Sequence, residues 1–340
     1  MDKLKYLILA CLIAVAGSFT TESTAQNTSD TEHIDALKDM LKSESFSLGM
    51  LIQSRAVFSF DENGARGFSV PQARFKGSGS LDGGFNYKLH FDVADGFTLL
   101  DAEIGYAINE QSTLTVGAQK PGISYEFLTG PNKIDFVTRS LVVTALTQNR
   151  DFGARLSGNY ASGFNYSLGV FNGNGLNAND NNKFYYAARF AYETEVQGDG
   201  SFVAGVNGSY GEQSNTPISS GTLPNIDGER TIFGGDFRFE NSTFILASEV
   251  LAANLEYTGF NEADNVMGLH VTGGLKLDKS ELLARYDNLS SDFRNDQDRI
   301  VLGFTRYPTS QTAFRINYLV PLDDSSFDNH GLALNYQIEF

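Results

Sequence analysis

Residues 331–340 read GLALNYQIEF, and the alternation in this stretch decides the fold that the sequence predicts. Five apolar or aromatic residues fall on one face of an extended chain: Leu332, Leu334, Tyr336, Ile338 and Phe340. Four small or polar residues fall on the other face: Ala333, Asn335, Gln337 and Glu339. Successive side chains of a β-strand point to opposite faces, so a period of two residues indicates a strand with one apolar face and one polar face.

The same alternation recurs from Phe46 to Phe340 and defines about sixteen predicted strands. They cover residues 46–58, 67–79, 85–93, 98–108, 112–119, 150–160, 164–172, 183–194, 200–210, 229–240, 242–253, 264–276, 280–289, 297–306, 311–320 and 329–340. An even number of strands suits an antiparallel barrel with both termini on the periplasmic side. The last stretch resembles the closing strand of a bacterial outer-membrane β-barrel, whose terminal aromatic residue serves as an assembly signal. We therefore expect an all-β transmembrane barrel.

The segments between the predicted strands alternate in length. The short ones carry the turn residues of tight hairpins and include residues 82–84, 109–111, 161–163, 241–243, 278–279 and 309–311. The long ones are rich in Asn, Asp, Gly and Ser and span residues 61–66, 120–149, 173–182, 211–228, 254–263, 290–296 and 321–328. Short turns at one end and long loops at the other are typical of outer-membrane barrels, whereas a soluble β-sandwich does not need this alternation.

Ionic side chains lie on one face of nearly every predicted strand. In residues 280–289, for example, Leu282 and Tyr286 share one face, whereas Arg285 and Asp287 share the other. A membrane barrel turns its apolar face to lipid and its charged face to an aqueous lumen. An Arg or Lys that faces lipid at the midplane costs about 2–4 kcal/mol, so this penalty fixes which face is which. A barrel of this strand number is wide enough to hold a water channel.

Composition narrows the function classes further. The net charge is −16 and no basic stripe is visible, so we expect no nucleic-acid partner. The single cysteine is Cys11, and the four histidines show no metal-binding spacing, so we expect no metal site and no cofactor. After the N-terminus no apolar run approaches the ~18 residues that a spanning helix requires.

Residues 1–25 have the features of a secretory signal peptide. Lys3 and Lys5 give the positive start, an apolar stretch follows, and Ala25 ends a small-residue cleavage site. A lipoprotein signal at Cys11 is the alternative, although the apolar run before it is short. We expect export across the inner membrane with removal of this leader.

Residues 26–45 are polar and then briefly helical in pattern, because Ile34, Leu37 and Leu41 repeat at helical spacing. We expect a periplasmic N-terminal segment, either a loose tail or a small oligomerisation helix. Residues 46–340 then form the barrel domain.

The connector at residues 120–149 reads KPGISYEFLTGPNKIDFVTRSLVVTALTQN and is too apolar for an exposed loop. Connectors of about 30 residues are uncommon in compact folds and are usually functional. We expect this one to fold back into the barrel, where it narrows the channel.

Four stretches of this region look like the constriction-loop region of the phosphate-selective porin O/P family. They are YEFLT at 125–129, IDF at 134–136, TRSLV at 138–142 and RDFG at 150–153, and YSLGVFNG at 166–173 is similar as well. The resemblance extends as barrel architecture from about residue 46 to the C-terminus, with the motifs concentrated in residues 115–190. It implies a homotrimer of 16-stranded barrels in outer-membrane lipid that passes small anions, phosphate among them.

Charged side chains in a narrow aqueous passage set the selectivity of a pore. Lys120, Lys133 and Arg139 lie in or beside the connector, so we expect them at the pore constriction. Eight further basic residues of the predicted strands form a candidate track along the lumen: Arg55, Arg74, Lys76, Lys88, Arg155, Arg189, Arg238 and Arg315. The planar fork of Arg binds two oxygens of an oxyanion at once.

A structural role for these basic residues is the alternative. Inward carboxylates are available to pair with them and brace the barrel: Asp92, Asp101, Glu103, Asp151, Asp236, Glu249 and Asp287. In that case Arg139 ties the folded connector to the wall.

The leading functional hypothesis is a porin for passive diffusion of small polar or ionic solutes. An outer-membrane barrel enzyme of the lipid-hydrolase type is one alternative, but no His has a Ser or Asp signature beside it. A barrel whose long loops bind a partner, as in an adhesin, is the other, and the apolar connector argues against it.

Overall fold

The computed structural model describes residues 46–340 except 62–63, 148, 197, 219–222 and 323–329. The expected signal peptide at 1–25, the lipoprotein alternative at Cys11 and the expected periplasmic segment at 26–45 lie outside the described residues and stay predictions.

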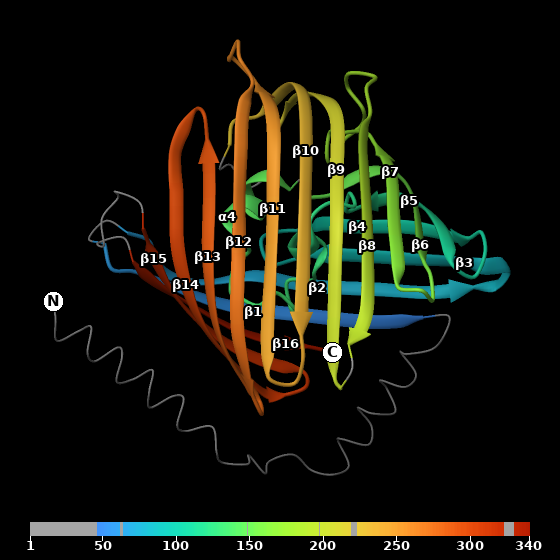
Figure 1. Ribbon diagram of the computed structural model, residues 1–340. Coiled ribbons are helices and arrows are strands. Elements are labelled where there is room, and N and C mark those ends of the chain that lie inside the picture. The colour runs from blue at the N-terminus through green and yellow to red at the C-terminus, as the bar shows by residue number, and fades with distance from the viewer. Residues whose placement is uncertain (1–45, 62–63, 148, 197, 219–222, 323–329) are drawn as a thin grey trace, which may run out of the picture. The chain divides into compact units, whose positions relative to one another are not determined.

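The described part of the chain contains sixteen strands that close into one antiparallel barrel (Figure 1). Each strand pairs with its neighbours in the sequence, and β1 pairs with β16 to close the sheet. The strands are β1 (Ser47–Ser59), β2 (Arg66–Leu81), β3 (Phe85–Asp92), β4 (Thr98–Ala107), β5 (Ser112–Gln119), β6 (Asp151–Asn159), β7 (Phe164–Phe171), β8 (Tyr185–Val196), β9 (Gly200–Thr216), β10 (Ile226–Glu240), β11 (Phe244–Tyr257), β12 (Asp264–Leu277), β13 (Ser280–Ser291), β14 (Arg294–Thr309), β15 (Thr312–Pro321) and β16 (Gly331–Glu339). The predicted fold class is therefore confirmed.

The apolar and ionic faces lie as the alternation predicts. On β16, Tyr336 and Ile338 are 43% and 41% exposed on the outside of the barrel, whereas Asn335 and Gln337 are 2% and 4% exposed. On β13, Leu282 and Tyr286 are exposed outside and Arg285 is buried inside. The outside is thus an apolar belt fit to contact hydrocarbon, and the polar groups line the interior.

Short turns gather at one end of the barrel and most longer loops at the other. The end with short turns holds a 3-10 turn, η1 (Asp82–Gly84), in which Gly83 and Gly84 take the positive φ that glycine tolerates best. The expected long loop at 290–296 is wrong. Strands β13 and β14 pair up to Ser291 and Arg294, so only two residues remain between them.

The strands differ in length around the barrel. Strands β9 to β14 run for 12–17 residues, whereas β3 to β7 run for 8–10. Figure 1 shows the longer strands as the tall ribbons at the front. Two short helices, α3 (Tyr125–Leu128) and α4 (Leu141–Leu146), interrupt the connector between β5 and β6. Within the described residues, no helix has the length and apolar content needed to cross a membrane.

Candidate functional site: a narrowed pore

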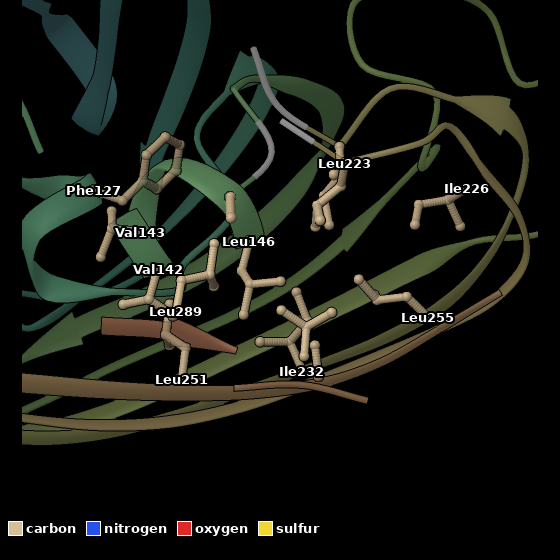
Figure 2. Close-up of a cluster of buried hydrophobic side chains, with 14 of the residues drawn as sticks. Phe127, Val142, Val143, Leu146, Leu223, Ile226, Ile232, Leu251, Leu255 and Leu289 are labelled. Carbon is tan, nitrogen blue, oxygen red and sulfur yellow. The ribbon is translucent and has the colours of Figure 1, made fainter. Parts of the chain in front are cut away.

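The connector between β5 and β6, residues 120–150 and called the lumen loop below, folds into the barrel as expected. Helix α4 packs on the inner face of β11, β12 and β13. Its Val142, Val143 and Leu146 are fully buried in one apolar cluster with residues of the wall, among them Leu251 and Ile232 (Figure 2). Burying one such side chain stabilises by about 1.5–3 kcal/mol, so the cluster fixes the loop against this side of the barrel.

The apolar cluster also explains where the simple alternation fails. Strand β11 carries Leu246 and Val250 on its outer face, yet Leu251 and Leu255 on its inner face are fully buried. The inner leucines contact the lumen loop instead of water. A strand that is apolar on both faces is therefore the place where the loop lies.

A serine side chain caps the N-terminus of each of the two loop helices. The side chain of Ser140 accepts a hydrogen bond from the Val143 N–H at the start of α4, and Ser124 does the same for Phe127 at the start of α3. Serine is a favoured residue at this position because its oxygen satisfies a backbone donor that the helix leaves unpaired.

Buried charges hold both helices of the loop to the wall. Arg285 on β13 donates to Glu126 Oε1 at 3.2 Å, and Glu126 Oε2 accepts the Ser140 N–H at 2.8 Å. Asp287 accepts the Leu141 N–H at 2.9 Å, at the N-terminus of α4. Removing one member of a buried pair strands the other charge, which typically costs about 3–5 kcal/mol. These contacts make the loop part of the barrel and not a free flap.

Residues 131–137 are tied to other strands. Arg238 on β10 binds both carboxylate oxygens of Asp135, at 2.8 and 3.1 Å. The Val137 N–H donates to the Asn317 side chain on β15 at 2.6 Å, while the Val137 carbonyl accepts from Arg55 on β1 at 3.2 Å. The loop is thus anchored from β10 around to β1, and the wall of β2 to β4 faces it across the lumen.

The three expected constriction residues lie in different surroundings. Arg139 is held by backbone carbonyls of the loop, with Nε at 3.1 Å from the Glu126 oxygen and Nη2 at 2.8 Å from the Thr129 oxygen. Lys133 is exposed in the lumen on the side of the short turns.

Lys120 is the most enclosed of the three. Its ammonium donates to the Phe127 carbonyl and stands 4.5 Å from the centre of the Phe127 ring. Burial, followed by the positive charge of Arg139, lowers the pKa of Lys120 to about 6. Most Lys120 side chains are therefore uncharged at neutral pH.

Part of the expected basic track lies close to Lys120 and Arg139 in the lumen. Arg74 pairs with Asp92 at 2.9 Å, and Lys88 pairs with Asp101 at 3.3 Å. Arg155 lies 4.0 Å from Glu103. Arg150, which the sequence analysis did not select, pairs with Asp101 at 3.1 Å. Arg150 begins the motif RDFG at the end of the loop, and this position is the sequence signal for it.

We call this group the basic cluster. It comprises Arg55, Arg74, Lys88, Lys120, Arg139, Arg150 and Arg155, with Asp92, Asp101 and Glu103 as its acidic members. Seven basic groups meet three carboxylates, an excess of four, or of three with Lys120 neutral. The local field is positive although the whole chain is acidic.

The other members of the expected track lie apart from this cluster. Arg189 donates to Asp236 through both Nη1 and Nη2, and Arg238 is shared between Asp135 and Glu240. Arg315 donates to Gln337 and to the Asn132 carbonyl. Arg189 and Arg238 have the carboxylate contacts of the bracing alternative, whereas Arg315 contacts only neutral groups of the wall and the loop. Lys76 is exposed on β2, and no ion pair to it is seen among the described residues.

Two cavities lie on opposite sides of the loop, and Ile134 lines both. The outer cavity, on the side of the long loops, has a volume of about 570 Å³. Arg55, Arg139 and Arg150 line it, and none of its described lining residues is a carboxylate.

The inner cavity, on the side of the short turns, has a volume of about 490 Å³. Four basic side chains line it: Lys133, Arg238, Lys276 and Arg315. Six carboxylates join them: Glu126, Asp135, Glu240, Glu249, Glu281 and Glu339. The lining therefore changes from basic outside the loop to mixed in charge inside it, where carboxyl groups outnumber basic groups.

A family model described as phosphate-selective porin O and P matches residues 52–326, which is most of the chain. The chain belongs to this family. The porin is a passive channel of the outer membrane for small polar or ionic solutes, and the alternatives of a barrel enzyme and of an adhesin fall away.

Solved structures similar to this porin are also outer-membrane barrels. An anion-selective porin from Comamonas acidovorans is 13% identical, with a TM-score of 0.66 over 87% of this chain and 99% of that one. A loop-deleted OmpT of Vibrio cholerae is 14% identical, with a TM-score of 0.62 over 87% and 99%. Salmonella typhi OmpF in complex with daunomycin is 12% identical, with a TM-score of 0.60 over 87% and 97%. At such identities the likeness shows the fold alone. No curated protein matches the chain.

Proposed function

We propose that this porin favours anions, phosphate included, over cations. The basic cluster carries the proposal, because the lumen loop and the wall of β2 to β6 hold an excess of positive groups beside the passage. Selectivity arises where charged groups act on an ion at close quarters in a narrow aqueous channel. The name of the family and the anion selectivity of the Comamonas acidovorans porin support the same direction.

The three arginines of the outer cavity differ in how they are neutralised. Carbonyl oxygens hold Arg55 and Arg139, and neither forms an ion pair within the described part of the chain. Arg150 has a carboxylate partner, Asp101, but Lys88 and His90 contact the same carboxylate. Carbonyl groups are neutral dipoles, so they position the guanidinium groups of Arg55 and Arg139 without cancelling the positive charge. The outer cavity therefore attracts anions.

The test is the reversal potential of single channels in a planar bilayer under a KCl gradient and then a potassium phosphate gradient. We expect discrete conductance steps, and in both salts we expect a reversal potential with the sign of an anion-favouring pore. A cation-favouring sign would overturn the proposal, and a lack of any steps would overturn the assignment as a channel.

Lys133 tests how far the inner cavity contributes. Because Lys133 is exposed in that cavity, Lys133→Glu should lower anion permeability and shift the reversal potential toward that of a cation-favouring pore. Lys279→Glu makes the same charge change in the turn between β12 and β13, where Lys279 is not part of the lining of either cavity, and is the control. An unchanged reversal potential in Lys133→Glu would remove Lys133 from the selectivity site.

We also propose that the porin assembles as a homotrimer in outer-membrane lipid. The family resemblance supports this state, and one of the similar structures is a trimer form of OmpT of Vibrio cholerae. Light scattering of the purified protein, corrected for bound detergent, should give three times the chain mass. A monomeric mass with normal conductance would contradict the trimer.

Export with removal of residues 1–25 completes the proposal, followed by a periplasmic segment at 26–45 and the barrel domain at 46–340. The positive start, the short apolar stretch and the small-residue site support it. The intact mass of protein from outer membranes should correspond to a chain that starts at Gln26. A mass that retains the leader would contradict cleavage at this site.

A further inference from the structure

The lining of the outer cavity combines three arginines with a large set of apolar side chains, and neutral polar residues such as Gln53, Thr138 and Asn174 complete it. Besides Arg55, Arg139 and Arg150, it is lined by Leu99, Phe127, Pro131, Ile134, Val137, Leu176, Pro217 and Ile218. A phosphate ion is polar on every face and gains nothing from such a wall. An anion with an apolar portion can place its charge on the arginines and its hydrocarbon on the remaining lining.

The guanidinium groups keep donors for such a ligand. Arg139 uses Nε and Nη2 on loop carbonyls, and Arg150 uses Nε and Nη1 on Asp101 and Asn149. Within the described residues, Arg139 Nη1, Arg150 Nη2 and Arg55 Nη1 form no hydrogen bond. Carboxylates fit the planar fork of Arg through two oxygens.

The size of the cavity also agrees with an organic ligand. Its volume of about 570 Å³ lies within the range of about 300–1,000 Å³ that is usual for small-molecule sites. A bare inorganic ion would leave most of this space to water. A benzene ring or a short alkyl chain with one carboxylate would occupy far more of it.

We propose that the outer cavity binds and admits amphiphilic organic carboxylates, those with one acidic group on an aromatic ring or short hydrocarbon chain. This inference rests on the proposed anion preference and names the solute class for the same passage. The solute enters from the long-loop side, pairs with the arginines, and passes the loop at Ile134. Its apolar part then leaves the apolar lining for the polar inner cavity, which favours release.

The experiment measures block of single-channel chloride current by benzoate and by acetate at pH 7.5, where both are ionised. Benzoate should reach half-block at a concentration about tenfold lower than acetate, the effect expected from burying slightly under about two methylene equivalents. A bilayer without protein serves as the blank. Equal half-block concentrations would overturn the inference, while the reversal potential in KCl reports separately on anion preference.

Variants locate the apolar contact. Leu99 on β4 and Leu176 in the loop between β7 and β8 are half-buried in the cavity lining and lie outside the apolar cluster that fixes the lumen loop. Leu99→Ser and Leu176→Ser should each raise the half-block concentration of benzoate severalfold. Both variants should leave the half-block concentration of acetate and the reversal potential in a KCl gradient unchanged. Val57→Ser, on the inward face of β1 but outside the cavity lining, should change neither anion. Unchanged benzoate block in both leucine variants would contradict the proposed contact.

Discussion

At the scale of single residues, the lumen shows how a charged side chain can be present without acting as a charge. The position of Lys120 at the start of the loop predicts a place at the constriction, and in the structure its side-chain nitrogen faces the Phe127 ring and carbonyl. Arg139, Arg150 and Arg74 lie close enough to oppose its protonation, and of the carboxylates only Asp101 favours it among the strongest influences. Position in the sequence cannot predict the charge state of Lys120, which depends on groups from β2, from β4 and from the far end of its own loop.

The lowered pKa predicts that selectivity depends on pH. Lys120 has a pKa of about 6 in the folded porin, below its ordinary value, so it is mostly neutral at pH 7.5 and mostly protonated at pH 5. Lowering the pH over this range adds a positive charge to the basic cluster. The anion-to-cation permeability ratio should rise by about twofold, because one charge acting through water and salt changes the energy of an ion by a fraction of a kcal/mol.

The measurement is the reversal potential in a KCl gradient at both pH values, in the wild type and in Lys120→Met. Methionine keeps the chain on the Phe127 ring and cannot be protonated. His90 beside Asp101 and the carboxylates of the cluster remain in both proteins, so the difference between the two belongs to Lys120. An identical pH response in Lys120→Met would show that another group titrates.

At the scale of elements, the lumen loop is held by contacts of long sequence separation. Arg285 and Glu126 are 159 residues apart, and Arg238 and Asp135 are 103 apart. The apolar composition of residues 120–149 was sufficient to predict that the loop folds inward, because those side chains need burial. It was not sufficient to predict which wall the loop meets, since any inward arginine was a candidate partner. The apolar inner face of β11 was the one sequence signal for that wall, and simple alternation conceals it.

The same scale explains the wrong loop at 290–296. The polar composition of residues 290–296 indicates a loop, but β13 and β14 stay paired to Ser291 and Arg294 beyond the apolar belt. Outward polar groups at this end bond to one another, as Tyr286 does to Asp298 at 2.6 Å. Strands that extend into water need no apolar alternation, so the pattern ends before the strand does.

Close packing of the loop predicts a way to widen the pore. A Cβ atom added at Gly303 on β14 would lie 3.0 Å from Phe136 and 3.2 Å from the Asn317 amide, which holds the Val137 N–H. Gly303→Val should therefore push residues 136–137 off the wall, at a cost of about 1–3 kcal/mol for overpacking. We expect higher single-channel conductance with more current noise, measured in planar bilayers. Gly273→Val on β12 adds the same side chain where no atom lies within 4 Å, and it should leave conductance unchanged.

At the scale of the whole molecule, one rule produced most of the correct prediction. Each second residue of a strand meets either lipid or the lumen, so the sequence must alternate and the barrel can be recognised from it. The same rule cannot say how the charges of the lumen are divided, because 25 basic and 41 acidic residues average to −16 over the chain. Only the fold separates a basic outer side of the loop from an inner side where carboxyl groups outnumber basic groups. The direction of ion preference is therefore a property of three-dimensional placement.

The lipid-facing assignment itself can be tested on one strand. Val116, near the middle of β5, is 53% exposed on the outer face, whereas Thr113 of the same strand points inward. Val116→Lys places a charge against hydrocarbon and should lower the free energy of unfolding by about 2–4 kcal/mol, while Thr113→Lys should cost far less because water reaches the lumen. Urea titration of the refolded porin in lipid vesicles, followed by the electrophoretic mobility of the folded form, measures both. Equal losses in the two variants would mean that the outer face of β5 is not in contact with hydrocarbon, and a larger loss in Thr113→Lys would reverse inside and outside.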